Sequence, residues 1–177
     1  MSTRRRNQGF TLIELLIVVA IIGIVAAIAV PALVRARIAS LESAAIGSLR
    51  TINAAESTYA SSCGRGGYAQ SLDDLSKPAA GSAQLFISPD VAANGVSKSG
   101  YIMNASADVS ATTVTPAAMT CNASAQDAMS SYFAEAHPQS IGVSGQRSFA
   151  TDARGSLYFT SDGSIVAPGM AGASVLR

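Results

Sequence analysis

An uninterrupted apolar run at residues 10–30 constrains this chain more than any other stretch of its sequence. The run holds one charged residue, Glu14, and no proline. About twenty such residues form a helix long enough to cross the hydrocarbon core of a bilayer. Three arginines at positions 4–6 precede the run, and basic residues tend to stay on the cytoplasmic side. The sequence therefore predicts a single-pass membrane helix with a cytoplasmic N-terminus.

The expected processing site lies before this run rather than after it. A secretory signal peptide carries its cleavage site behind the apolar segment, next to small residues. No such site follows the run here, and the helical pattern continues beyond it. The natural cut is at Gly9, which opens the string GFTLIE at residues 9–14. Residues 1–9 are thus predicted to be a leader peptide that is removed.

This string and the run that follows it, through Pro31, resemble the N-terminus of type IV pilins and of the related pseudopilins of type II secretion. The resemblance is dense up to Pro31 and much looser beyond it. In that family, a prepilin peptidase cuts after the glycine and methylates the new N-terminal amine. The resemblance implies that Gly9 is the last leader residue and that Phe10 is the methylated first residue of the mature subunit.

Glu14 is the most informative single residue of the run. A carboxylate inside a membrane costs on the order of 3 kcal/mol on insertion scales, so it needs a partner. Cleavage at Gly9 would expose an ammonium on Phe10, about 6 Å away along a straight helix. Pairing with the amine of a neighbouring subunit is geometrically easier and would set the axial stagger, as the resemblance also implies. The alternative is a carboxylate at the membrane edge that extends to water.

Gly23 and Pro31 interrupt an otherwise strong helical pattern. Proline inside a helix removes a hydrogen bond, and glycine lowers helix propensity by about 1 kcal/mol relative to alanine. We therefore predict that the helix bends or loses helical order between these two residues. The resemblance implies such a loss when pilins pack into a filament. The alternative is that both residues are simply tolerated, as they often are in membrane helices.

The helical pattern becomes amphipathic over residues 31–62. Apolar residues recur there at spacings of three, four and seven, which places them on one helical face. Most charged residues of this stretch, including Glu42 and Glu56, are expected on other faces. One helix is thus predicted from Phe10 to Ser62, and the apolar stripe of its second half requires a sheet to cover it. The stripe comprises Ile38, Leu41, Ala45, Leu49, Ile52 and Tyr59.

The helix is expected to end at Cys63, because glycines follow that residue directly. A connection to the sheet is predicted at residues 63–99. Within it, Ser71 and Asp74 have the spacing of a capping box, which predicts a short helix. Residues 84–88 could form a brief strand.

Strand patterns dominate residues 100–177. The clearest pair, at residues 147–151 and 156–160, flanks a four-residue hairpin loop that ends in glycine. Residues 100–105 and 131–137 are further candidate strands. Together they predict an α+β fold in which an antiparallel sheet of three or four strands packs on the long N-terminal helix. The resemblance implies the same plan, that of the type IV pilin fold.

Two segments of this domain are expected to lie outside the sheet. Residues 106–130 are long and weakly patterned, which indicates an exposed, variable face. The tail at residues 163–177 is rich in glycine and alanine, so we expect it to be loosely held.

The chain has two cysteines, Cys63 and Cys121. In an exported protein, two cysteines favour a disulfide over a metal site. A bond closing this loop would add about 4 kcal/mol of stability on the chain-entropy model. Free thiols are the alternative, because sequence spacing alone does not settle geometry. Two cysteines and one histidine make no tetrahedral zinc set, and we predict neither a metal nor a cofactor.

No catalytic residues are predicted, because the sequence contains no phosphate-binding loop and no hydrolase motif. His137 precedes a proline and is expected at a strand end. Asp152 and Asp162 flank the last hairpin, where some pseudopilins hold calcium, but the oxygens are few and their spacing fits no EF-hand. Removing the leader changes the formal charge from +1 to −2, and neither value favours a nucleic-acid partner.

These features, with the resemblance, predict a structural pilin subunit. The precursor would wait in a bacterial inner membrane, with residues 10–30 in lipid and the C-terminal domain outside the cytoplasm. The pilus assembly machinery would then extract it into an extracellular helical homopolymer. The same apolar surface would face lipid first and sister helices later.

Two alternatives stay open at this point. The chain could be a minor pilin or a pseudopilin, since Glu14 argues only against tip subunits that lack this carboxylate. It could also be a non-polymerising single-pass membrane protein with a small ligand-binding or enzymatic domain, although the pilin-type leader argues against this. The use of the filament is equally open, because adhesion, twitching motility, DNA uptake and electron transfer share this N-terminus.

Overall fold

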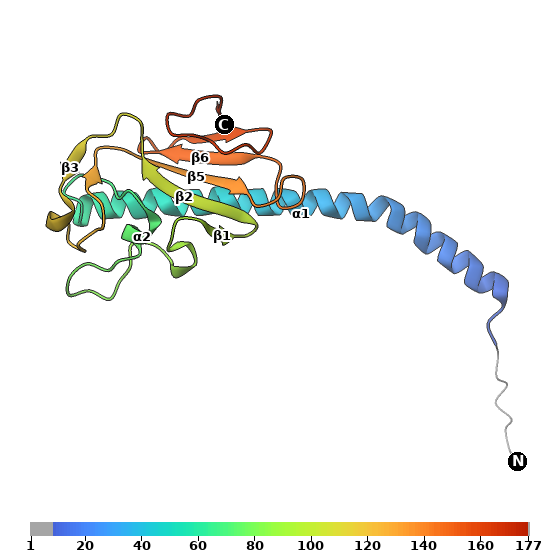
Figure 1. The fold of residues 1–177 in the computed structure, drawn as a ribbon. Coiled ribbons are helices and arrows are strands. Elements are labelled where there is room, and N and C mark those ends of the chain that lie inside the picture. The colour runs from blue at the N-terminus through green and yellow to red at the C-terminus, as the bar shows by residue number, and fades with distance from the viewer. Residues whose placement is uncertain (1–8, 177) are drawn as a thin grey trace, which may run out of the picture. The chain divides into compact units, whose positions relative to one another are not determined.

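The computed structural model describes residues 9–176, so the arginines of the predicted leader lie outside the described residues. The described chain divides into two compact units, one ending at Arg37 and the other beginning at Ile38 (Figure 1). Helix α1, Leu12–Ser62, contributes to both units. Its first half makes up the N-terminal unit, and its second half is the scaffold of the C-terminal unit.

In the N-terminal unit, α1 begins at Leu12, slightly later than predicted. Every side chain from residue 9 to residue 37 is exposed. The helix continues without a break through Gly23 and Pro31, the two positions at which we expected it to bend or lose order. A loss of helical order inside a filament therefore stays a prediction.

The C-terminal unit contains a six-stranded antiparallel sheet in the order β1-β2-β5-β6-β7-β8. The α+β class is confirmed, but the predicted count of three or four strands was too low. The four central strands match the sequence patterns. The edge strands β1 and β8 are too short to produce a recognisable alternating pattern. The strands are β1 Val96–Lys98, β2 Tyr101–Ala107, β5 Tyr132–Pro138, β6 Ser148–Asp152, β7 Leu157–Thr160 and β8 Ser174–Val175.

The apolar stripe of α1 packs against this sheet, as the helical spacing predicted. The stripe is buried except for Leu41, which is half-buried at its margin. The strands supply the other side of the core from alternate positions, since side chains of a strand point to opposite faces in turn. Those of β2 and β5 are Tyr101, Met103 and Ala105, and Tyr132, Ala134 and Ala136.

The C-terminal tail is held to the opposite face of the sheet, contrary to the expectation of a loose end. Val166 is buried against Phe133 of β5 and Ala150 of β6, and β8 pairs with β7. The expectation was wrong because Val166, with Met170 and Ala173 packed beside it, anchors a segment whose composition is otherwise typical of a loose tail. Strands β5 and β6 are consequently buried on both faces.

The connection after α1 contains the predicted short helix α2, Leu72–Leu75. Ser71 caps it, because its hydroxyl accepts a hydrogen bond from the Asp74 backbone N–H. The predicted strand at residues 84–88 is absent. Phe86 instead packs edge-on against Tyr59 of α1, and side-chain packing of this kind needs no strand partner. A short 3₁₀ helix, η1 Pro89–Val91, follows.

Residues 106–130 are more ordered than a plain exposed loop. Strands β3, Thr113–Thr115, and β4, Ala128–Met129, form a separate two-stranded sheet, and η2, Ala117–Met119, lies between them. The predicted disulfide Cys63–Cys121 is confirmed, with Cα atoms 4.7 Å apart. It joins the end of α1 to this segment.

Glu42 of α1 is buried, although the helical pattern placed it away from the apolar stripe. Its Oε1 accepts the backbone N–H groups of Gln146 and Arg147 at 3.0 and 3.2 Å. Its Oε2 accepts the Arg147 Nε and Nη2 at 2.9 and 2.6 Å. The carboxylate thus joins α1 to the start of β6, and the guanidinium also lies over the ring of Phe149.

Candidate assembly site on the N-terminal helix

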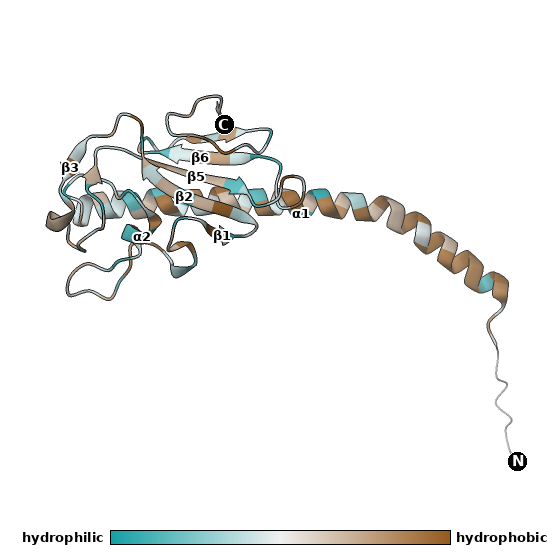
Figure 2. Cartoon of the chain, in the orientation of Figure 1, coloured by the Kyte–Doolittle hydropathy of each residue, from teal (hydrophilic) through white to brown (hydrophobic). Residues whose placement is uncertain are grey.

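The first half of α1 presents an apolar surface on every side. Phe10 is 82% exposed, and Val18, the least exposed of the large apolar side chains in residues 10–30, is still 46% exposed. Figure 2 shows this as an almost continuous hydrophobic band with one hydrophilic spot near its start. Glu14 is the one charged residue of this run. By length and composition the segment could cross a membrane. Because water solvates such a surface poorly, lipid or other helices must cover it.

Thr11 and Glu14 form a capping box at the start of α1. The Thr11 hydroxyl accepts a hydrogen bond from the Glu14 backbone N–H at 3.2 Å. In return, the Glu14 carboxylate accepts the Thr11 backbone N–H at 3.4 Å and its hydroxyl at 3.1 Å. These bonds satisfy backbone donors that a helix otherwise leaves open at its N-terminus. A carboxylate in the first turn also interacts favourably with the helix dipole.

The capping box orients Glu14 within its own chain. Both bonds from Thr11 go to Oε2, and among the described residues Oε1 accepts no hydrogen bond. The side chain is therefore held in place and still has an oxygen available for a partner. Sequence reasoning missed the role of Thr11, although the T-x-x-E spacing that signals a capping box was present in the string.

Gly9 and Phe10 lie directly before the cap, in exposed backbone that is neither helical nor paired. The peptide bond between them is thus open to an enzyme. Phe10 is the immediate neighbour of Thr11, so an amine created at Phe10 would lie at the positive end of the α1 dipole. Gly9, Phe10 and Glu14 all lie within one short segment of the sequence, in which Glu14 is bonded to Thr11.

Gly23 and Pro31 lie further along α1, on the same exposed surface. A Cβ added at Gly23 would meet no atom within 4 Å, so nothing in the single chain requires a glycine there. Pro31 is accommodated inside the helix.

Comparison with known families matches residues 4–30 to the prokaryotic N-terminal methylation motif. The chain therefore carries this motif at its N-terminus and is similar over part of its length to a type IV major pilin. The type IV major pilin protein PilA of Myxococcus xanthus strain DK1622 is 50% identical over 54 residues. These residues make up 30% of this chain and 24% of that protein, so the match spans about a quarter of the relative's length. No solved structure matches the chain.

The methylation motif covers most of the candidate assembly site. Gly9, Phe10, Glu14 and Gly23 lie inside it, and Pro31 follows its last matched residue. The pilin-like arrangement of a long apolar helix and an antiparallel sheet extends beyond the motif and comes from the structure.

The remaining sequence candidates lie in the C-terminal unit and are engaged in local contacts. The Nδ1 atom of His137 lies 3.0 Å from Glu135 Oε2. Asp152 pairs with Arg154, and Asp162 accepts hydrogen bonds from Ser164. Over residues 9–176, no three His, Cys, Asp or Glu side chains gather in a way that could hold a metal ion.

Proposed function

We propose that this chain is the precursor of a structural pilin subunit, one that polymerises through α1 into a type IV pilus. The observation that supports this most strongly is the form of the first half of α1. It is apolar and exposed on every side, and its single carboxylate is held in the first turn by Thr11. The family motif covers this same segment. A structural role of this kind requires no catalytic residues in the chain.

The first step in this proposal is processing by a prepilin peptidase. The enzyme would cut between Gly9 and Phe10, in the exposed backbone before the cap, and would methylate the new amine of Phe10. Cleavage removes the arginines at positions 4–6, which hold the N-terminus on the cytoplasmic side. The processed helix could then leave the membrane without carrying those charges across it.

The second step is docking through charge. The new Phe10 ammonium would lie at the positive end of the α1 dipole, which is an unfavourable place for a cation. Glu14 of a neighbouring subunit could neutralise it, since Glu14 Oε1 has no described partner within the chain. Each subunit offers one such amine and one such carboxylate. This pairing would fix the axial stagger between successive subunits.

The third step is burial of the apolar surface. In the bilayer, the large side chains of residues 10–30 contact lipid, and in the filament they would contact the same segment of other subunits. Transfer from lipid to a helix bundle gains little from the hydrophobic effect itself, because both surroundings are apolar. The assembly machinery of the inner membrane would therefore extract the subunit, and close packing would hold the filament.

A pseudopilin is the second candidate, because pilins and pseudopilins share this N-terminal segment. The similar Myxococcus xanthus protein is named a major pilin, which favours a pilus subunit. A pseudopilin would form a short filament in the periplasm and would not accumulate outside the cell.

Mass spectrometry of material sheared from cell surfaces tests the proposal. We expect abundant protein whose N-terminal peptide begins at methylated Phe10. The same processed terminus found only in the membrane fraction would indicate a pseudopilin or a minor pilin. A chain that still begins at Met1 in all fractions would overturn the filament proposal and leave a plain membrane anchor.

A further inference from the structure

Glu56 is fully buried near the end of α1. Its Oε2 accepts one hydrogen bond, from the backbone N–H of Ala69 at 2.9 Å. Its Oε1 is buried and has no partner among the described residues. An ionised carboxylate has about four acceptor sites and is costly to bury without donors or a cation. One N–H group is far fewer donors than the charged form requires.

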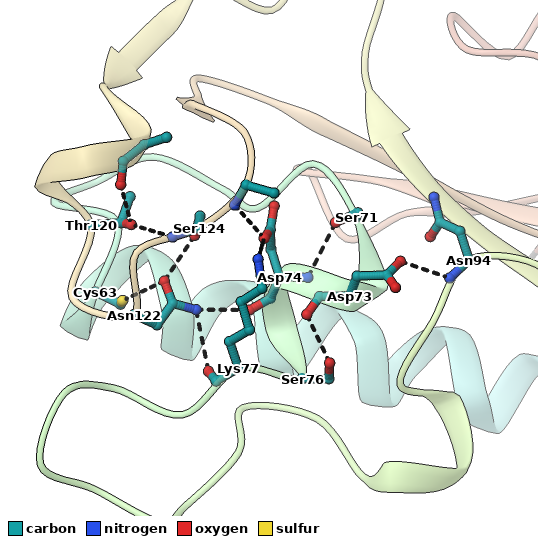
Figure 3. Close-up of polar contacts among 12 residues, drawn as sticks. Cys63, Ser71, Asp73, Asp74, Ser76, Lys77, Asn94, Thr120, Asn122 and Ser124 are labelled. Atoms are coloured by element: carbon teal, nitrogen blue, oxygen red, sulfur yellow. Dashed lines mark hydrogen bonds and ion pairs between the residues drawn. The ribbon is translucent and has the colours of Figure 1, made fainter.

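Asp74 of α2 is the acidic residue whose charge acts on Glu56, and it is also fully buried. Asp74 Oδ1 accepts the Lys77 Nζ at 2.8 Å and the Ala125 backbone N–H at 2.7 Å (Figure 3). Asp74 Oδ2 has no partner. Lys77 thus forms its ion pair with Asp74, and among the described residues no cation pairs with Glu56.

Tyrosines are the other titratable groups that act on Glu56. Tyr59 lies on α1 itself, and its hydroxyl is hydrogen-bonded to Ser124. Tyr132 comes from β5, where its hydroxyl donates to Asn53, and its ring packs against Tyr68. Burial raises the pKa of the Tyr59 and Tyr132 hydroxyls, and a tyrosine hydroxyl carries no positive charge, so neither compensates a negative charge on Glu56.

Gln70 has a third buried oxygen without a hydrogen-bond donor, in addition to Glu56 Oε1 and Asp74 Oδ2. Its Nε2 donates to the backbone carbonyls of Tyr68 and Ala69 at 2.9 and 3.0 Å, which fixes the amide orientation. Its Oε1 is therefore an acceptor, and it is buried without a donor. Glu56, Asp74 and Gln70 thus leave three buried acceptors without a donor.

We propose that Glu56 is a proton-binding site, at which the folded subunit keeps a neutral carboxylic acid in a region whose buried acceptors outnumber its donors. Burial raises the pKa of Glu56 well above its ordinary value, and the charge of Asp74 raises it further against the opposing effect of the Ala69 N–H. This proposal concerns the C-terminal unit and does not depend on filament formation.

The proton couples the stability of the subunit to pH. Because the folded-state pKa lies above the unfolded value of 4.5, the folded state binds more protons between these two pKa values. The stabilisation is complete below the unfolded pKa and decreases as pH rises toward the folded pKa. As Glu56 ionises, repulsion from Asp74 should loosen the contact between α1 and the segment that carries α2.

Equilibrium unfolding of the full-length chain in detergent micelles, measured by denaturant titration from pH 5 to pH 8, tests this. Glu56→Gln keeps the shape and supplies a permanent N–H donor. We expect the wild-type folding constant to fall by up to tenfold per pH unit relative to this variant. Infrared spectra should show a protonated carboxyl band in the wild type that the variant lacks.

Glu42→Gln is the matched control, because Glu42 is also buried but its two oxygens accept N–H groups of Gln146 and Arg147, and arginine does not titrate in this pH range. It should keep the pH slope that Glu56→Gln removes. A Glu56→Gln chain with the wild-type slope and the wild-type carboxyl band would overturn the proposal. If that variant does not fold, the wild-type spectrum decides. A protonated carboxyl band that persists at neutral pH and shifts in the Asp74→Asn variant supports the proposal. A wild-type spectrum without this band at neutral pH overturns it.

Discussion

The two halves of α1 belong to one continuous helix, but the first half is exposed on every side and the second half has one buried face. Up to Arg37, every described side chain is exposed, including a full turn-by-turn set of large apolar residues. From Ile38 onward, one face is buried against a sheet built by the same chain. The second half therefore completes its own fold, whereas the first half needs a partner from outside the chain. In the proposed pilin subunit, assembly and folding thus depend on different halves of one helix.

The glutamates of α1 show the same division at the level of single residues. Glu14 is exposed and bonded only to its own helical turn. Glu42 is buried and paired with Arg147, far along the chain. Glu56 is buried with one N–H donor. The first is available to another subunit, the second stabilises the fold, and the third senses pH in our proposal.

Replacing Glu14 by alanine should have the largest effect, and only on assembly. We expect filaments to be lost from the sheared fraction, because the Phe10 ammonium of a neighbour then has no anion to pair with. The denaturant stability of the C-terminal unit should stay at the wild-type value. Electron microscopy and immunoblotting of sheared material measure the first effect. Normal filament yield would contradict the division between the two halves.

Removing the disulfide should lower the stability of the C-terminal unit and leave the N-terminal unit unchanged, which is the opposite of the effect of replacing Glu14. The double change Cys63→Ser and Cys121→Ser should lower the free energy of unfolding by about 4 kcal/mol on the chain-entropy model for a loop of this length. Processing at Gly9 should be unaffected, because it takes place in the other unit. Urea titration and N-terminal mass spectrometry check the two statements. The reduced wild type should reproduce the loss of stability.

Glu42→Ala should destabilise the C-terminal unit by about 2–3 kcal/mol. The change leaves the backbone N–H groups of Gln146 and Arg147 without an acceptor and the Arg147 guanidinium without its anion. The half-exposed guanidinium keeps the loss below that of a fully buried pair. Urea titration measures it. Asp90→Ala, which breaks the exposed pair with Lys98, is the control and should change little.

The smallest effect is expected at Thr11. Thr11→Val removes the hydroxyl of the capping box and should weaken the first turn of α1 by about 1 kcal/mol. Amide hydrogen exchange in micelles should therefore accelerate about fivefold at Glu14 and stay unchanged in the C-terminal unit. Thr11→Ser keeps the oxygen and should behave as the wild type. Equal acceleration in both variants would mean that the cap does not hold the turn.

Sequence reasoning reached the N-terminal features because each depends on neighbours within a few residues. The length of the apolar run, the position of Glu14 and the predicted cut at Gly9 are read directly from the sequence. The β6–β7 hairpin and the Ser71 cap are equally local, since Gly155 adopts a positive φ of 74° in the loop and Ser71 bonds three residues ahead. The Thr11 capping box is also a local feature, and its T-x-x-E spacing was present in the sequence but was not recognised.

Other features depend on contacts that no short window contains. Glu42 looked like a solvent-facing charge until folding placed Arg147, 105 residues away, beside it. Glu56 meets Asp74 only because α2 folds back on α1, and Val166 anchors a tail that composition alone describes as loose. Burial is a property of the packed chain rather than of a segment, so helical spacing identified the apolar stripe but not the polar side chains that folding buried beside it.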